Sequence, residues 1–209
     1  MIVLKYQKTD SVRFISHIDL LRHVDRIIRR GEIKVNYSQG FNPHPLMYFS
    51  PPLSLGIGSS AEYLTIDTDM DKDEVLARYN AVVPDALKAS KVFACAKNPN
   101  LQAKVTCADY VFDVPFEKYT LDDVIEVEYE KKGKLVTENV RDKIYGAFNV
   151  GGKLCLRLAS GSVNLRPDRL IDDINKKCAT SICVCDIEKI NQYVESDGLV
   201  AVDKWLENC

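Results

Sequence analysis

Hydrophobic and polar positions in the first hundred residues follow two different periods. Segments rich in β-branched and aromatic side chains, typical of strands, alternate with segments that have apolar residues at helical spacing. The order strand, helix, strand, strand, helix, strand predicts a ferredoxin-like domain. The expected strands are residues 2–7, 34–37 with its continuation 46–50, 61–67 and 90–96, and the expected helices are 17–30 and 72–82.

Both expected helices have clear boundaries. Ser16 is a good N-cap for the first helix, and Gly31 stands where a C-cap glycine belongs. Asp71 is the expected cap of the second helix. Pro84 ends that helix, because the residue before a proline avoids the helical region.

The second half repeats this order of elements without residue-by-residue similarity. Asn98-Pro-Asn is typical of a linker, so we expect an N-terminal domain over 1–97 and a C-terminal domain over 98–209. The expected fold class is α+β, with two tandem ferredoxin-like halves whose antiparallel sheets carry helices on one face. The second half has expected strands at 105–114, 135–145, 153–159 and 181–187, expected helices at 121–125 and 168–177, and a tail at 199–206 that adds one or two helical turns.

Composition narrows the class of protein. The chain has 209 residues, of which 46% are hydrophobic and 28% charged, as in ordinary globular proteins. No apolar run reaches the roughly 20 residues that span a bilayer. The apolar stretch at the N-terminus is interrupted by polar residues too early for a signal peptide. We therefore expect a cytoplasmic protein. The seven cysteines are scattered without a Cys-x-x-Cys pair, and Cys183 and Cys185 would share one face of a buried strand. We therefore expect no disulfide framework and no metal site.

Charge is distributed unevenly along the chain. Residues 1–50 hold eight Lys and Arg against four Asp and Glu, a net charge of +4, whereas the whole chain has −2. The remaining residues therefore carry −6. All three histidines also lie in the first 50 residues. The polar chemistry of the protein is expected to be concentrated there.

The first helix has two opposite faces. At 100° per residue an apolar arc includes Leu20, Val24 and Ile28, and four arginines lie in the opposite arc. An arginine face can be a solvated surface, since cations near a helix C-terminus are favoured by its dipole. It can also bind phosphates, whose geometry the guanidinium fork matches. The sequence leaves both interpretations open for Arg22, Arg26, Arg29 and Arg30.

Two further groups of residues are candidates for binding. Arg13, Ser16 and His17 adjoin the N-terminus of the first helix, where free amides favour an anion. The alternative for His17 is a partly buried, hydrogen-bonded side chain. The loop 37–46 combines aromatic rings with polar groups that suit base edges, whereas the alternative is a stiff structural loop. Its polar candidates are Gln39, Asn42 and His44.

Several segments of the first half resemble a known bacterial family. They are Arg-Phe-Ile-Ser-His-Ile-Asp-Leu-Leu-Arg at 13–22, Tyr-Ser-Gln-Gly-Phe-Asn-Pro-His-Pro at 37–45, Pro-Leu-Ser-Leu-Gly at 52–56 and Ala-Glu-Tyr-Leu at 61–64. The chain resembles the radical SAM-linked proteins, a domain of unknown function fused to, or encoded beside, a cobalamin-binding-type radical SAM protein. The gene neighbours of that family often include a ribonuclease of the E/G type and ribosomal proteins.

The resemblance implies an accessory protein with a radical SAM enzyme as partner, and RNA or a ribosomal component as a further partner. The chain has no Cys-x-x-x-Cys-x-x-Cys for an iron–sulfur cluster, so no cofactor is expected. The leading hypothesis is an RNA-binding or substrate-presenting partner of a radical SAM enzyme, without catalysis of its own. One alternative is a protein-interaction module that does not contact RNA.

The second alternative is a metal-independent endoribonuclease. The paired ferredoxin-like pattern is similar to that of CRISPR RNA-processing endoribonucleases, an analogy of fold only. Histidine as a residue type has an unperturbed pKa that suits both proton transfers of RNA cleavage, so His17 and His44 are the candidate acid and base. This hypothesis depends on geometry, because the two imidazoles must converge on one phosphate.

Overall fold

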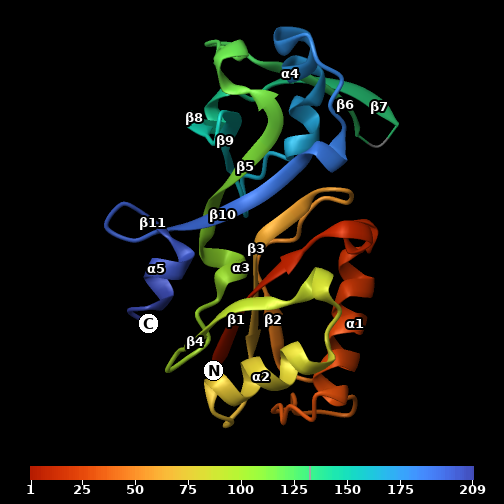
Figure 1. The fold of residues 1–209 in the computed structure, drawn as a ribbon, viewed down its shortest axis with the longest axis vertical. Coiled ribbons are helices and arrows are strands. Elements are labelled where there is room, and N and C mark those ends of the chain that lie inside the picture. The colour runs from red at the N-terminus through yellow and green to blue at the C-terminus, as the bar shows by residue number, and fades with distance from the viewer. Residues whose placement is uncertain (132) are drawn as a thin grey trace.

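The first half of the chain forms a four-stranded antiparallel sheet with two helices on one face (Figure 1). The computed structural model describes residues 1–131 and 133–209. The strands lie in the order β4-β1-β3-β2. The elements are β1 (Ile2–Lys8), α1 (His17–Arg30), β2 (Met47–Phe49), β3 (Gly58–Ile66), α2 (Lys72–Val82) and β4 (Ala89–Ala94).

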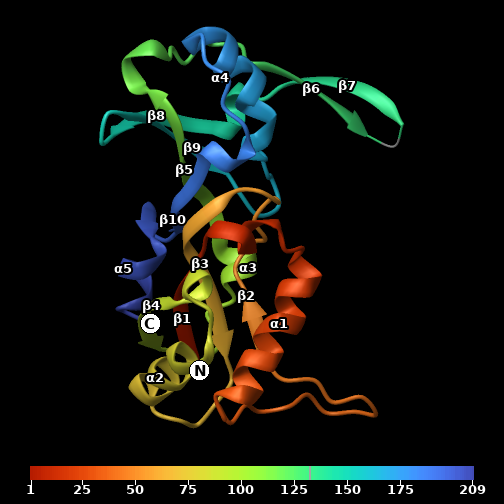
Figure 2. The same cartoon turned by 45° about the vertical axis from the view of Figure 1, so that its right-hand side comes forward.

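The second half contributes four more strands in the order β10-β5-β9-β8, all antiparallel to their neighbours. The hairpin of β6 and β7 projects from this part of the molecule (Figure 2), and β11 pairs with β10. The elements are α3 (Leu101–Lys104), β5 (Val105–Pro115), β6 (Glu126–Lys131), β7 (Lys134–Asn139), β8 (Ile144–Val150), β9 (Lys153–Ala159), α4 (Ile171–Cys178), β10 (Ile187–Glu195), β11 (Leu199–Ala201) and α5 (Val202–Leu206).

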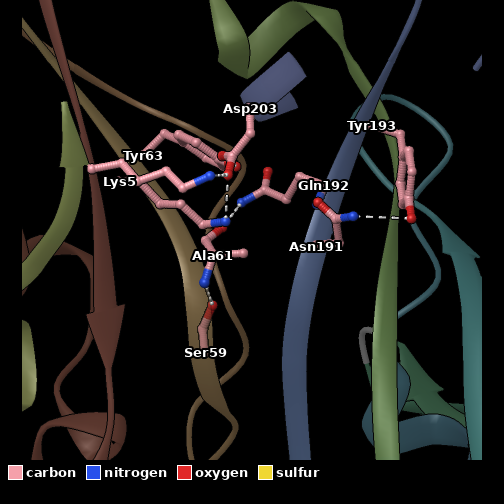
Figure 3. A network of polar contacts seen from close by, with 9 residues as sticks. Lys5, Ser59, Ala61, Tyr63, Asn191, Gln192, Tyr193 and Asp203 are labelled. Atoms are coloured by element: carbon pink, nitrogen blue, oxygen red, sulfur yellow. Dashed lines mark hydrogen bonds and ion pairs between the residues drawn. The ribbon is translucent and has the colours of Figure 1, made fainter. Parts of the chain in front are cut away.

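A short parallel pairing joins the two groups of strands. β3 and β10 pair only at Gly58 with Glu188 and at Ser59 with Lys189. Farther along, the side chain of Gln192 crosses from β10 and donates a 2.5 Å hydrogen bond to the Ala61 carbonyl (Figure 3). The result is one nine-stranded, mostly antiparallel sheet that runs through both predicted halves.

Helices cover both faces of this sheet, which corrects the expectation of one face. Leu4 and Leu64 pack with α1 and α2 in one core, whereas their strand neighbours Val3 and Tyr63 pack with α5 in another. Asp203 of α5 accepts hydrogen bonds from Lys5 (3.0 Å), Lys91 (2.8 Å) and Tyr63 (2.5 Å). These contacts fasten the C-terminal segment to the far side of β1, β3 and β4.

The two helices of the first half are confirmed at both ends. Ser16 caps α1 by accepting a hydrogen bond from the Asp19 amide, and Gly31 follows the last residue of α1. Asp71 caps α2 by accepting from the amides of Asp73 and Glu74. Strong local signals therefore agree with the packing.

Four local predictions were wrong. The strand expected at 135–145 is interrupted, because β7 ends at Asn139, residues 141–143 form a 3₁₀ turn and β8 begins at Ile144. Residues 121–125 are not helical, because Ile125 begins the approach to the β6–β7 hairpin and pairs with Val140 instead. Residues 34–37 form no strand beyond an isolated bridge at Tyr37. Residues 181–187 are not a strand either: Cys183 and Cys185 are exposed beside the 3₁₀ turn Val184–Asp186, and β10 begins at Ile187. The Cys183 amide donates to the Asp186 carboxylate (2.8 Å), and such local bonds compete with strand pairing.

Candidate functional site

The exposed face of α1 carries the largest group of predicted site residues. Leu20, Val24, Ile27 and Ile28 are buried against the sheet, as the helical spacing predicts. The four arginines on the opposite side are exposed. Because the spacing i, i+4, i+7, i+8 keeps them on one side, the side chains of Arg22, Arg26, Arg29 and Arg30 form what we call the arginine face.

The arginine face is only weakly neutralised by its own surroundings. Arg22 lies 3.4 Å from Asp19, and Arg29 lies 3.0 Å from Asp25. Arg30 donates to the Val82 carbonyl (2.9 Å), and Arg26 has no ion pair with any residue that the structure describes. Exposed ion pairs contribute about 1 kcal/mol or less. An external anion can therefore bind these guanidinium groups without breaking a strong contact.

The surface along the arginine face is hollowed. One shallow hollow of about 520 Å³ extends from Phe14 to Arg26, and a second of about 550 Å³ is lined by His23, Arg26, Arg29 and Arg30. The two hollows share His23 and Arg26, so they adjoin each other along the helix, and we call the two together the α1 groove. A groove lined by guanidinium groups suits an extended anionic chain better than a small neutral molecule.

The loop of residues 37–45 lies beyond the C-terminal end of α1 and projects from the body of the protein (Figure 2). Its base is closed by a bridge between Tyr37 and Pro45. The Ser38 hydroxyl lies 2.8 Å from His44 Nδ1 and also accepts from the His44 amide (3.1 Å). His44 therefore shapes the loop. Gln39 and Asn42 are exposed near its tip.

His17 points away from the arginine face. Its ring packs edge-on against Phe49, with 5.9 Å between ring centroids, and it lines a small cavity with Lys8, Ser50 and Glu62. Burial lowers the pKa of the His17 imidazole, and the nearby Lys8 ammonium lowers it further. The cavity measures about 10 Å³, room for a single water molecule, so it admits no substrate group larger than one atom.

Buried charges beneath this end of α1 were not predicted from the sequence. Lys189 lies 2.6 Å from Glu62, and the Ser59 hydroxyl donates to the same carboxylate (2.6 Å). Lys8 donates to the Ile15 carbonyl (3.0 Å), and burial lowers the pKa of its ammonium. Glu62 continues an inward row with buried Leu64 and Ile66. In the sequence, Glu62 stands at a strand position whose alternation places it on the same face as two apolar residues, and this pattern could have revealed it.

Arg13, Ser16 and His17 do not form one anion pocket. Arg13 reaches the junction of the two groups of strands, where its Nη1 donates to the Cys185 carbonyl (2.7 Å). The Ser16 hydroxyl is occupied by Asp19, to which it donates at 2.7 Å. His17 lines the small buried cavity. The three side chains therefore have separate surroundings and do not converge on one ligand.

His17 and His44 do not share a site in this arrangement. His17 is the first residue of α1, whereas the loop that holds His44 lies beyond the last residue. Fourteen residues of helix span about 21 Å, far more than one phosphate. Within the described part of the chain, no three His, Cys, Asp or Glu side chains are grouped to hold a metal ion. None of its helices is long and apolar enough to cross a membrane.

Comparison with known proteins places these features in a family. The family model described as an uncharacterized protein conserved in bacteria (DUF2344) matches residues 1–167. The matched region includes α1, the loop of residues 37–45 and the strands up to β9. No curated protein matches the chain.

Proposed function

The chain belongs to this family of uncharacterized bacterial proteins, and we propose that it is an RNA-binding accessory protein. The observation that carries the proposal is the α1 groove, in which four exposed arginines on one helix face line two adjoining shallow hollows. In this role the guanidinium groups hold phosphates of the RNA backbone, because their forked donors match phosphate oxygens.

The distribution of charge supports a local site. The whole chain has a net charge of −2, so the protein is not a general coat for nucleic acid. Residues 1–50 carry +4 and the remaining residues −6, so the basic excess is confined to the part of the chain that forms α1 and the loop of residues 37–45. A polyanion approaching this surface is repelled by the acidic parts and attracted to the arginine face.

We further infer that the chain consists of two ferredoxin-like halves. Within each half the strands lie in the order fourth, first, third, second: β4-β1-β3-β2 and β10-β5-β9-β8. In the second half the β6–β7 hairpin occupies the place of the first helix. The segment between β4 and α3 then marks the boundary near residue 98, and the arginine face belongs to the first half.

The resemblance to radical SAM-linked proteins supports the proposal that the bound RNA is the substrate of a partner enzyme. We propose that the chain acts in the bacterial cytoplasm and presents RNA to a radical SAM enzyme, which carries out the chemistry. The motif segments that support this partner lie in residues 13–64. They include α1 and the loop of residues 37–45, which are the elements that form the proposed RNA surface.

A salt titration of RNA binding tests the proposal. Cellular RNA should bind the wild-type protein with an affinity that falls steeply with salt, because counterions are released from the phosphates. The double variant Arg22→Glu and Arg26→Glu should lose roughly tenfold or more in affinity, and its salt slope should become shallower by about 1.4, at about 0.7 per lost phosphate contact on a single strand.

The matched control reverses two lysines outside the groove. Lys72 and Lys88 are exposed and paired with Asp73 and Asp85, so Lys72→Glu with Lys88→Glu changes the net charge equally. Equal losses in both double variants, or binding that does not respond to salt, would refute the proposal. A complex with the radical SAM enzyme that forms without RNA and is lost only in the arginine variant would instead favour a protein-interaction module.

A further inference from the structure

We propose that the ligand of the α1 groove is single-stranded RNA, about six nucleotides of which lie between two aromatic rings that stack on its bases. The rings are Phe14 at the N-terminal end of the groove and Phe41 at the tip of the loop beyond its C-terminal end. This inference rests on the proposed function and names its substrate class.

Phe14 is an exposed ring at the entrance of the groove. The residue is 59% exposed. The ring lines the same hollow as Arg22 and Arg26. One edge of the ring lies near Gly56, since a Cβ added there would be 3.6 Å from Phe14 Cε1. A flat, accessible ring beside guanidinium groups is the arrangement that single strands use for stacking.

Phe41 is fully exposed at the opposite end. The loop that carries it is held by the Tyr37–Pro45 bridge and by the hydrogen bonds between Ser38 and His44. Pro43 and Pro45 fix the backbone further, because proline locks its φ angle. The ring is therefore presented to solvent by a closed loop, and binding costs little ordering of the chain.

The length of α1 sets the scale of the ligand, because the two rings lie beyond its opposite ends. The fourteen residues of α1 span about 21 Å. A stacked strand advances roughly 3.4 Å per phosphate, so about six nucleotides cover the groove. The bases of a duplex are paired and stacked on one another, whereas those of a single strand are free to stack on protein rings. The two terminal rings therefore favour a single strand over a duplex.

Fluorescently labelled oligoadenylates of three, six, nine and twelve nucleotides, together with a twelve-base-pair RNA duplex, test this inference on the full chain. Affinity should rise steeply between three and six nucleotides and then level off, and the duplex should bind more weakly than the single strand. Phe14→Ala and Phe41→Ala should each weaken binding of the six-mer by roughly five- to a hundredfold. Their salt slopes should stay at the wild-type value, because no phosphate contact is removed.

Two control variants keep the test sharp. Tyr145 is also an exposed aromatic residue, 54% exposed but on β8, so Tyr145→Ala should bind as the wild type does. Phe14→Leu keeps an apolar side chain and the fold but removes the ring, and it should lose affinity as Phe14→Ala does.

Wild-type affinity in the Phe14 and Phe41 variants, or tight duplex binding, would overturn this inference. The same results with weakened binding in the arginine variants would leave the proposed function intact. If neither the phenylalanine variants nor the arginine variants weaken RNA binding, and polyglutamate of equal charge displaces the RNA, the groove binds an acidic protein partner. That result would overturn both this inference and the proposed function.

Discussion

At the scale of single residues, the short parallel pairing of β3 and β10 depends on the buried carboxylate of Glu62. Glu62 and Lys189 are 6% and 3% exposed at their side chains and lie 2.6 Å apart. Lys8 is buried nearby. Desolvation makes such charges costly unless they are paired. Glu62 is therefore the group that makes two buried ammonium groups tolerable under the N-terminus of α1.

Glu62→Gln is expected to destabilise the protein by about 3–5 kcal/mol, because Lys189 then stays buried without its counter-charge. Glu74→Gln is the control, since Glu74 pairs with Arg78 at 2.8 Å on an exposed helix face and should cost about 1 kcal/mol or less. Urea denaturation measures both. Equal losses of unfolding free energy in the two variants would show that the buried pair contributes no more than an exposed one. The double variant Glu62→Gln with Lys189→Met should recover part of the stability that Glu62→Gln loses.

The sequence could reveal some of these residues and not others. The arginine face follows from helical spacing within fourteen residues, so it was predictable. The pair of Glu62 and Lys189 joins strands 127 positions apart in the chain, and no local period reports such a contact. Arg13 was predicted beside His17, but its guanidinium extends to Cys185, across the same junction.

At the scale of elements, the loop of residues 37–45 is shaped by its own side chains. Ser38 and His44 share one pair of hydrogen bonds across its base. The loop positions Phe41 only while this base stays closed. His44, which the sequence suggested as a contact to bases, is therefore expected to act through the loop.

Ser38→Ala should have a larger effect than His44→Ala, because it removes both hydrogen bonds to the Ser38 hydroxyl, whereas His44→Ala keeps the one that the backbone amide of residue 44 donates. A neutral hydrogen bond contributes about 1 kcal/mol, so His44→Ala should lose roughly fivefold in affinity for the six-nucleotide RNA, and Ser38→Ala should lose more. The double variant should lose no more than Ser38→Ala. Loss of affinity in His44→Ala alone would show instead that the imidazole contacts the RNA directly.

The elements that the sequence predicted well are those with local caps. α1 and α2 have side chains at their N-caps that accept backbone hydrogen bonds. Thr120 offered residues 121–125 a comparable N-cap, but a five-residue helix is too short to be stable by itself. Of the β6–β7 hairpin, the sequence predicted β7 within the strand expected at 135–145 and missed β6.

At the scale of the whole molecule, the body is elongated (Figure 2). The arginine face lies on the first half, and the β6–β7 hairpin projects from the second. The sheet is continuous between them. An RNA strand is therefore expected to bind one region of the surface and leave the other bare.

Amide hydrogen exchange of the full chain, with and without a six-nucleotide single-stranded RNA, tests this account most directly. Exchange should slow in residues 13–30 and 37–45, which form the α1 groove and the loop beyond it. Exchange in the β6–β7 hairpin should stay unchanged. Protection centred on the second half, or no protection in α1 and the loop at RNA concentrations that saturate binding, would contradict the account.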